Sequence, residues 1–314
     1  MQKQNGIDLV VLAGPTASGK TALAVDLCHR FNGEVVSADS MQVYDTLTVG
    51  TARPTTEEMG GIPHHLMGFL PPDASFSVAK YAELAHAAIA DVHARGKLPI
   101  LCGGTGLYIQ AVVENLSYEE QPASREIRER LRARIECEGG EALLAELAAV
   151  DPETAARLHP HDHGRIVRAL EIVQTTGRTI TEQNAASRAV ESPYRVCGLR
   201  LEYRNRDTLY DRINRRVSMM LDAGLVEEAD WLRRQPNTDT VRQAIGYKEL
   251  EPYLQGAVTL ETAADALRQA TRRYAKRQLS WFRRYDWLTP IYMDEAQPTA
   301  QAAACIEEFL RKEK

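Results

Sequence analysis

The sequence predicts an α/β fold with a parallel sheet, and two observations near the N-terminus carry this prediction. Residues 14–21 read GPTASGKT and match the phosphate-binding pattern G-x-x-x-x-G-K-[ST]. Residues 7–13 before them are apolar and β-branched, as in a buried parallel strand, and Leu23, Ala24 and Leu27 follow at helical spacing. Strand, glycine loop and helix in this order predict a P-loop NTPase-like core.

Two further strands are predicted in the first third of the chain, each with polar residues after it. Residues 34–37 form one strand, which leads to Asp39, and residues 98–102 form another, which leads to Thr105. A helix is expected between them at residues 78–94. Ligands of parallel α/β sheets bind at the carboxyl ends of the strands. We therefore expect the phosphate loop, Asp39 and Thr105 to converge on one site.

The pattern predicts three consecutive parts. Residues 1–114 form the first part of the core, and residues 115–192 form a purely helical insertion domain. Residues 193–314 return to the core with a strand at 194–201 and continue as C-terminal helices from Asp207 onward. The insertion has an apolar stripe at 127, 131 and 135, which is surrounded by Arg125, Arg128, Arg130, Arg132 and Arg134.

Composition excludes some classes of protein. The net charge of −5 argues against a chain that is basic all over, although the arginines are locally clustered. Five scattered cysteines, an odd number without a C-x-x-C pair, are typical of reduced thiols in the cytosol. No cleavable leader and no apolar run of membrane-spanning length is visible. We expect a cytoplasmic protein that does not bind membranes.

A basic helix is predicted from about residue 262 to residue 285. Its apolar and aromatic stripe contains Leu267, Tyr274, Gln278, Trp281 and Tyr285. Basic residues flank the stripe on both sides, at Arg272, Arg273, Lys276, Arg277, Arg283 and Arg284. One interpretation is a core helix with solvated edges. The other is a surface that binds nucleic acid, with aromatic rings for bases and arginines for phosphates.

Histidines at 159, 161 and 163, and the pair at 64–65, could suggest a metal site. No cysteine accompanies the first set, and Pro160 disfavours the strand that would place its three rings on one side. We expect no metal there, and we assign His64 and His65 a structural role.

Eight ordered motifs resemble those of the tRNA dimethylallyltransferase family of the bacterial type, also called tRNA isopentenyltransferases. They are GPTASGKT at 14–21, SADSMQVY at 37–44, GTARPT at 50–55, PHHL at 63–66, GGTGLYI at 103–109, HPHDHGRIVRALE at 159–171, AIGYKE at 244–249 and AKRQLSWFRR at 275–284. The resemblance implies transfer of a dimethylallyl group from its diphosphate to N6 of the adenosine at tRNA position 37. The partners would be dimethylallyl diphosphate and the anticodon stem-loop of tRNA, and the chain is expected to act as a monomer.

The loop residues suit a diphosphate, because glycine lets successive backbone N–H groups point at one anion. The expected donor contacts are Gly14, Thr16, Ala17, Ser18, Gly19, Lys20 and Thr21, with Thr21 also holding Mg²⁺. Asp39 alone could be a general base, a metal ligand or a helix cap. The resemblance favours the base and places Thr105 near the reacting amine or the leaving diphosphate.

Arginines are expected at both substrates. Arg212 and Arg216 lie one helical turn apart, and the resemblance assigns the diphosphate contact to this helix; both are candidates and we favour Arg212 as catalytic. The tRNA contacts that the resemblance implies are Asp39, Ser40, Met41, Gln42, Arg128, Arg165, Arg168, Arg242, Gly246, Tyr247, Lys248, Lys276, Arg277, Gln278, Trp281, Arg283 and Arg284.

Other functions fit parts of this pattern. The phosphate loop alone is compatible with a small-molecule or nucleotide kinase, which would need ATP. A non-catalytic RNA-binding module would not need Asp39 or Thr105. Prenyl transfer to a free adenine nucleotide shares the donor chemistry, but the arginine-rich segments favour a large RNA acceptor.

Overall fold

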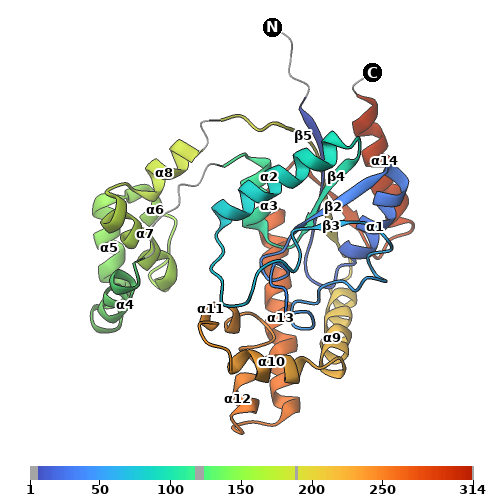
Figure 1. Cartoon of the computed structure of the whole chain (residues 1–314). Helices are drawn as coiled ribbons and strands as arrows, with labels where there is room; N and C mark the ends of the chain where they lie inside the picture. The colour runs from blue at the N-terminus through green and yellow to red at the C-terminus, as the bar shows by residue number, and fades with distance from the viewer. Residues whose placement is uncertain (1–5, 117–123, 188–189, 313–314) are drawn as a thin grey trace. The chain divides into compact units, whose positions relative to one another are not determined.

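The computed structural model describes residues 6–116, 124–187 and 190–312 (Figure 1). The chain divides into two compact units. The first combines residues 1–113 with residues 193–314, and we call it the core unit. The second comprises residues 114–192, and we call it the helical unit.

The core unit is built on a six-stranded sheet in which every strand pair is parallel. The strands are β1 (Ile7–Ala13), β2 (Gly33–Ala38), β3 (His64–His65), β4 (Leu98–Gly103), β5 (Tyr194–Glu202) and β6 (Leu288–Tyr292), in the order β3-β2-β4-β1-β5-β6. Val10 of β1 lies opposite Ile100 on one side and Cys197 on the other. The predicted α/β fold with a phosphate-loop core is confirmed.

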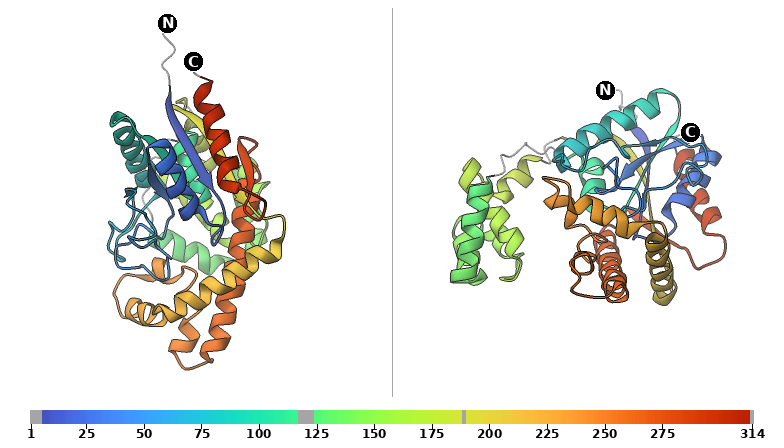
Figure 2. Two further views of the ribbon diagram at one scale, coloured as in Figure 1. Left: turned by 90° about the vertical axis from the view of Figure 1, so that its right-hand side faces the viewer. Right: turned by 60° about the horizontal axis from the view of Figure 1, so that its bottom comes forward.

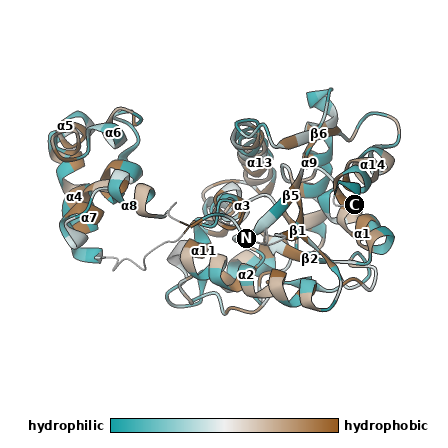
Figure 3. Cartoon of the chain, turned by 90° about the horizontal axis from the view of Figure 1, so that it is seen from above, coloured by the Kyte–Doolittle hydropathy of each residue, from teal (hydrophilic) through white to brown (hydrophobic). Residues whose placement is uncertain are grey.

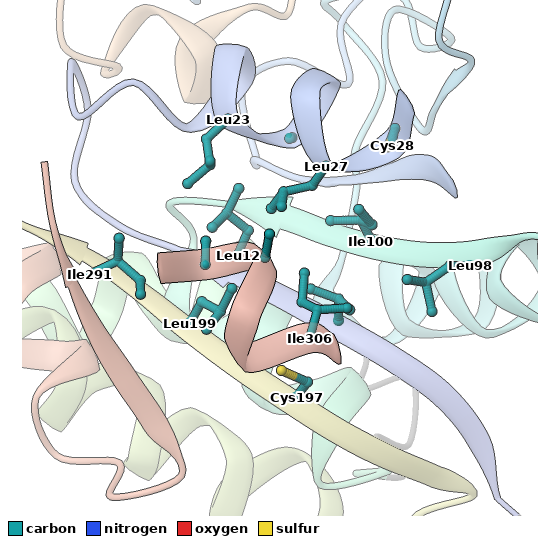
Figure 4. Close-up of a cluster of buried hydrophobic side chains, with 14 of the residues drawn as sticks. Leu12, Leu23, Leu27, Cys28, Leu98, Ile100, Cys197, Leu199, Ile291 and Ile306 are labelled. Carbon is teal, nitrogen blue, oxygen red and sulfur yellow. The ribbon is translucent and has the colours of Figure 1, made fainter. Parts of the chain in front are cut away.

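Helices cover both faces of the sheet, which explains why its central strands are apolar throughout. On one face, α1 (Lys20–Phe31) and α14 (Pro298–Arg311) pack against β1, β4 and β5. Figure 4 shows this cluster, with Leu27 of α1 and Ile306 of α14 pointing toward Leu12 and Leu199 of the sheet. On the other face, α2 (Val78–Ala94), α3 (Gly106–Val113) and the end of α13 (Leu260–Phe282) bury Tyr81 and Phe282.

A further helical layer lies beyond the carboxyl ends of the strands, below the sheet in Figure 1. It contains α9 (Arg206–Asp222), α10 (Leu225–Arg233), α11 (Asp239–Arg242), α12 (Glu251–Leu254) and the first half of α13. The long helices α9 and α13 pack side by side (Figure 2). Val43 and Leu47, from the segment after β2, are buried in the same cluster as Leu225 and Leu232 of α10. This layer therefore fixes the segment that follows β2 at the edge where ligands bind.

The helical unit has a core of its own. It consists of α4 (Arg125–Glu138), α5 (Gly140–Val150), α6 (Pro152–Ala155), α7 (His163–Thr176) and α8 (Ile180–Ser187). Leu131, Leu143, Leu147, Ile166 and Leu170 are buried among one another. Hydrophobic and hydrophilic residues alternate along α4, α5 and α7 (Figure 3), as expected of helices that bury one face.

Two strands differ from the sequence-based expectation. Residues 288–292 were expected to be helical with the rest of the C-terminal region, but they form the edge strand β6 beside β5. Pro290 is tolerated there because an edge strand needs only one set of ladder hydrogen bonds. The strand β3 is two residues long and gives no periodic signal. The predicted helix at 78–94 and strand at 7–13 have the expected bounds.

Candidate active site

A pocket of about 830 Å³ opens at the carboxyl ends of β1, β2 and β4. Its lining comes from the phosphate loop, the segment after β2, α9 and α13. The predicted residues that line it are Thr16, Ala17, Ser18, Gly19, Lys20, Thr21, Asp39, Ser40, Met41, Gln42, Arg212, Arg216, Tyr247, Arg277 and Gln278. The structure thus brings most of the predicted donor residues to one pocket. Gly14 and Thr105 are not among its lining residues.

Two residues of the phosphate loop have the left-handed conformation, Ala17 with φ of 61° and Gly19 with φ of 91°. Gly19 tolerates this conformation without cost, whereas Ala17 is strained by its Cβ. Since α1 begins at Lys20, the first backbone N–H groups of this helix have no carbonyl of an earlier turn to bind. These groups and the positive end of the helix dipole create a site for an anion.

Lys20 is held at the bottom of the loop, where its Nζ donates a hydrogen bond to the carbonyl of Pro15 at 2.7 Å. Burial lowers the pKa of Lys20 to about 8, although the nearby Cys102 and Asp39 oppose this shift. Arg216 lowers it further by charge repulsion. A bound diphosphate would stabilise the charged form of Lys20 and raise its pKa again, so the position of Lys20 suits binding of an anion.

Asp39 follows β2 and is partly exposed to the pocket. Its Oδ1 accepts a hydrogen bond from the backbone N–H of Met41 at 2.9 Å. No helix begins among residues 39–41, so this hydrogen bond stabilises a turn and does not cap a helix. Thr105, which follows β4, is hydrogen-bonded to the end of β2. Its Oγ1 accepts a hydrogen bond from Ser40 N at 3.0 Å, and its own N–H donates to Ala38 O at 3.0 Å. Thr105 therefore supports the segment that carries Asp39.

Arg212 and Arg216 both line the pocket from α9, one helical turn apart. Arg212 Nε donates to the carbonyl of Ala17 at 2.8 Å and is thus attached to the phosphate loop. Arg216 Nη2 donates to the carbonyl of Ala52 at 3.3 Å. Burial lowers the pKa of Arg216, while Asp39 and Glu58 act against this shift.

The basic helix α13 has a buried stripe and exposed basic edges, and nucleic-acid binding by these edges stays a prediction. Leu267 and Gln278 are buried, whereas Lys276 and Arg277 are exposed. Gln278 joins two loops of the core: its Oε1 accepts from Thr16 N, and its Nε2 donates to Gly104 O, both at 2.9 Å. Sequence reasoning missed this bridging role, and the predicted RNA contact of Gln278 stays a prediction.

Further basic residues of α13 have partners within the protein. Arg283 forms an ion pair with Glu202 at 2.6 Å. The guanidinium of Arg284 lies 4.1 Å from the ring centroid of Trp281, and that of Arg277 lies 5.6 Å from the ring of Tyr274. The side chains of Lys276 and Arg273 have no acidic partner in the described part of the chain. An exposed, incompletely neutralised basic face results.

The segment at residues 244–249 packs on the loop at residues 48–53. Tyr247 is buried, and its hydroxyl donates to Glu228 Oε1 at 2.8 Å. Gly246 has φ of 111°, and its N–H donates to Glu249 at 3.0 Å. Lys248 is exposed, and Arg242 lies 3.6 Å from Glu251. Sequence reasoning missed Glu228, because a glutamate on a helix gives no signal of its partners.

In the helical unit, two of the three predicted tRNA-contacting arginines share a buried partner. Arg128 and Arg168 each form an ion pair with Glu171 at 2.8 Å, whereas Arg165 is exposed. The rings of His159 and His161 lie 5.0 Å apart between their centroids. No cluster of three or more metal-ligating side chains occurs among the residues that the structure describes.

The fold and this pocket define a phosphate-loop protein with a carboxylate, a lysine and two arginines around one anion site. Comparison with known proteins gives the family. The model of the IPP transferase family matches residues 42–285. The chain belongs to the IPP transferase family.

The relatives cover nearly the whole chain. The tRNA dimethylallyltransferase of Caldanaerobacter subterraneus subsp. tengcongensis is 45% identical over 97% of this chain and 98% of its own length. That of Halalkalibacterium halodurans is 49% identical over 88% of both. Among solved structures, the tRNA isopentenylpyrophosphate transferase of Bacillus halodurans is similar with a TM-score of 0.72 and 44% identity, over 97% of both chains. A eukaryotic dimethylallyltransferase acting on tRNA is similar with a TM-score of 0.80 and 29% identity, over 98% of this chain and 80% of that one.

Proposed function

We propose that this chain transfers the dimethylallyl group of dimethylallyl diphosphate to N6 of the adenosine at position 37 of tRNA, beside the anticodon, and releases diphosphate. The single observation that carries the proposal is that Asp39 and the phosphate loop line the same pocket. A carboxylate beside the phosphate loop suits removal of a proton from an amine, but P-loop kinases also place one there to hold Mg²⁺, so the carboxylate does not exclude a kinase by itself. The family and its relatives support a tRNA acceptor over a free nucleotide.

The reaction breaks the bond between the allylic carbon and the diphosphate oxygen, and it forms a bond from that carbon to N6. Negative charge then grows on the leaving diphosphate. The start of α1, Lys20 and Arg212 line the pocket, and we assign their N–H groups and positive charges to this anion. Groups that bind the leaving anion more strongly as its charge grows lower the barrier, because they stabilise the transition state more than the ground state.

The acceptor amine is a poor nucleophile, because its lone pair is delocalised into the adenine ring. It must also lose a proton as the new N–C bond forms, since N6 would otherwise carry a positive charge. We assign the proton to Asp39. The hydrogen bond from Met41 N to Oδ1 orients the carboxylate, and Thr105 fixes the neighbouring Ser40. Positioned acid–base catalysis contributes about 10² to 10⁴ in rate.

We propose Mg²⁺ as the cofactor, on the chemistry of the residues present. Thr21 lines the pocket next to Lys20, so its hydroxyl lies in the part of the pocket that we assign to the diphosphate. Hydroxyl and carboxylate oxygens suit Mg²⁺, which is usually held by one or two protein groups together with substrate phosphates. Thr21 would hold the ion, whose positive charge would offset that of the diphosphate.

We propose that the acceptor is bound through local basic surfaces. The chain carries a net charge of −5, so attraction to RNA cannot come from its charge as a whole. The exposed side chains of Lys276, Arg277 and Lys248 in the core unit, and of Arg165 in the helical unit, are the candidate phosphate contacts. No helix in the described ranges is long and apolar enough to cross a membrane. A monomer in the cytoplasm is the state in which we propose that the protein acts.

The test uses one unmodified tRNA and Mg²⁺ in three parallel reactions. Labelled dimethylallyl diphosphate with tRNA should place label in RNA at adenosine 37. The same donor with AMP should give no product, and γ-labelled ATP should transfer no phosphate to small molecules or RNA. Prenylated AMP without prenylated RNA would contradict the proposal, and so would phosphate transfer in the third reaction.

A further inference from the structure

The carboxylate of Glu228 in α10 accepts hydrogen bonds from the first three backbone N–H groups of the loop at residues 48–53. Its Oε2 accepts from Thr48 N at 2.8 Å and from Val49 N at 2.9 Å. Its Oε1 accepts from Gly50 N at 2.7 Å and from the Tyr247 hydroxyl at 2.8 Å. Three consecutive backbone N–H groups thus converge on one carboxylate. Loops bind free anions with the same arrangement of N–H groups, and here the anion is a side chain of the protein.

The geometry around Gly50 shows that the contact is close. A Cβ at this position would lie 2.5 Å from the Tyr247 hydroxyl oxygen, so no larger residue fits without moving Tyr247. Burial raises the pKa of Tyr247 well above its usual range, and the charge of Glu228 and the hydrogen bond to it raise the pKa further. The phenol therefore stays protonated and keeps donating to Glu228.

The far end of the same loop contacts both sides of the pocket. The carbonyl of Ala52 accepts from Arg216 Nη2 and from Gln42 Nε2, each at 3.3 Å. The carbonyl of Thr51 also accepts from Gln42 Nε2 at 3.3 Å. Two hydrogen bonds inside the loop connect the residues bound by Glu228 to these carbonyls. Ala52 N donates to Val49 O at 2.9 Å, and Arg53 N donates to Thr48 O at 3.0 Å.

We propose that Glu228 is a positioning residue that acts through this loop on Arg216, and thereby on the diphosphate site. Ala52 has φ of 46°, so its carbonyl points toward Arg216 only while the turn is held in this left-handed conformation. Without the carboxylate, three backbone N–H groups lose their partner and the turn relaxes. Arg216 then loses the acceptor that directs its guanidinium toward the pocket. This inference rests on the proposed function for the identity of the anion.

A merely structural role for Glu228 is separable from this one. The helix α10 is anchored by Leu225, Ala229 and Leu232, which are buried in the cluster that also holds Tyr247 and Leu250. These apolar contacts do not involve the carboxylate. Removing the charge should therefore leave α10 in place and change only the loop.

The test measures binding of inorganic pyrophosphate by calorimetry with four full-length proteins: the wild type, Glu228→Gln, Arg216→Met and the double variant. Glutamine keeps the size of the side chain, but its NH₂ group is a donor and faces backbone donors. Glu228→Gln should weaken pyrophosphate binding about tenfold. Adding Glu228→Gln to Arg216→Met should weaken it by less than about twofold, because the residue through which Glu228 acts is already lost.

The matched control is Glu227→Gln, whose side chain is exposed on the same turn of α10, and its pyrophosphate affinity should equal that of the wild type. Equal affinity of Glu228→Gln and the wild type would overturn the inference, and so would independent, multiplicative losses in the double variant. If Glu228→Gln does not fold, Tyr247→Phe removes one of the four main hydrogen bonds and should weaken binding two- to threefold. Pyrophosphate binding involves no prenyl transfer, so absence of transfer by the wild type would reject the proposed function and leave this result standing.

Discussion

Gln278 and Thr16 are joined by a hydrogen bond that attaches the long helix α13 to the phosphate loop, with Thr16 N donating to Gln278 Oε1 at 2.9 Å. The other end of the same amide donates to Gly104 O, next to Thr105. One buried side chain thus fixes the ends of β1 and β4 relative to a helix whose exposed edge is basic.

We expect Gln278→Ala to weaken pyrophosphate binding about tenfold while the protein remains folded. Two hydrogen bonds are lost, each worth about 1 kcal/mol, and tenfold in affinity corresponds to about 1.4 kcal/mol. Titration calorimetry measures the affinity. Gln269→Ala, on an exposed position of the same helix, is the control and should bind as the wild type does. Equal affinities for all three proteins would contradict the bridging role.

Lys20 should make pyrophosphate binding pH-dependent. Because burial lowers its pKa to about 8, Lys20 loses its proton in the free protein as the pH rises through 8. Binding requires the charged form, so affinity should fall above pH 8 by up to about tenfold per pH unit. In Lys20→Met the affinity should be weaker at all pH values and should lack this fall. Ionisation of pyrophosphate affects both proteins equally, so the difference between their affinities reports on Lys20 alone. Parallel curves of affinity against pH for both proteins would refute the assignment of the pH dependence to Lys20.

Asp39→Asn should bind both substrates and slow the chemical step by at least about 10². The amide keeps the size of the carboxylate and can still accept from Met41 N, so the turn at residues 39–41 should survive. Single-turnover measurements with labelled donor isolate the chemical step. Recovery of the rate at high Mg²⁺ would show instead that Asp39 is a metal ligand.

Replacing Lys276 and Arg277 by alanine should weaken tRNA binding and reduce its salt dependence. Each single-strand phosphate contact contributes about −0.7 to the slope of log affinity against log salt, so the slope should flatten by roughly one to two units. Pyrophosphate affinity should stay the same. Arg311→Ala, which removes a charge from α14, should leave the slope unchanged. A slope that does not respond to the double replacement would exclude α13 as a phosphate-binding surface.

Glu171 should stabilise the helical unit at neutral pH. Burial disfavours its charge, but hydrogen bonds from Arg128 and Arg168 lower its pKa below the usual value. A carboxylate with a lowered pKa contributes stability above its unfolded pKa of about 4.3, and this contribution is lost as the pH falls through the folded value. Glu171→Gln should cost roughly 1–3 kcal/mol of unfolding free energy at pH 7 and less at pH 3. Thermal unfolding monitored by circular dichroism at both pH values provides the check.

The sequence predicts the phosphate loop and the strands beside it because their signals are local. A glycine pattern between an apolar run and a helical run needs no partner elsewhere in the chain to be recognised. The convergence of Asp39 with the loop follows from one general property of parallel sheets, and the pocket confirms it.

The contacts of Glu228 and Gln278 could not be predicted in this way. Each depends on where a helix packs, since Glu228 lies 178 positions from Gly50 and Gln278 lies 262 positions from Thr16. The strand β6 escaped prediction because five residues with a central proline give no alternating pattern. Long-range packing, rather than local preference, decides all three.

The placement of β1 between β4 and β5 has a consequence for biosynthesis. The partner of Asp8 on one side is Arg195, which lies 187 positions later in the chain. At about 5–20 residues per second, a ribosome needs roughly ten to forty seconds to make the intervening segment. During this time, one apolar edge of the central strand has no neighbour, and the nascent chain exposes it to chaperones and to other nascent chains. The helical unit has a core of its own, so it can fold before β5 is made. Strand β5, which begins at Tyr194, would then pair with β1 directly after a segment that is already compact.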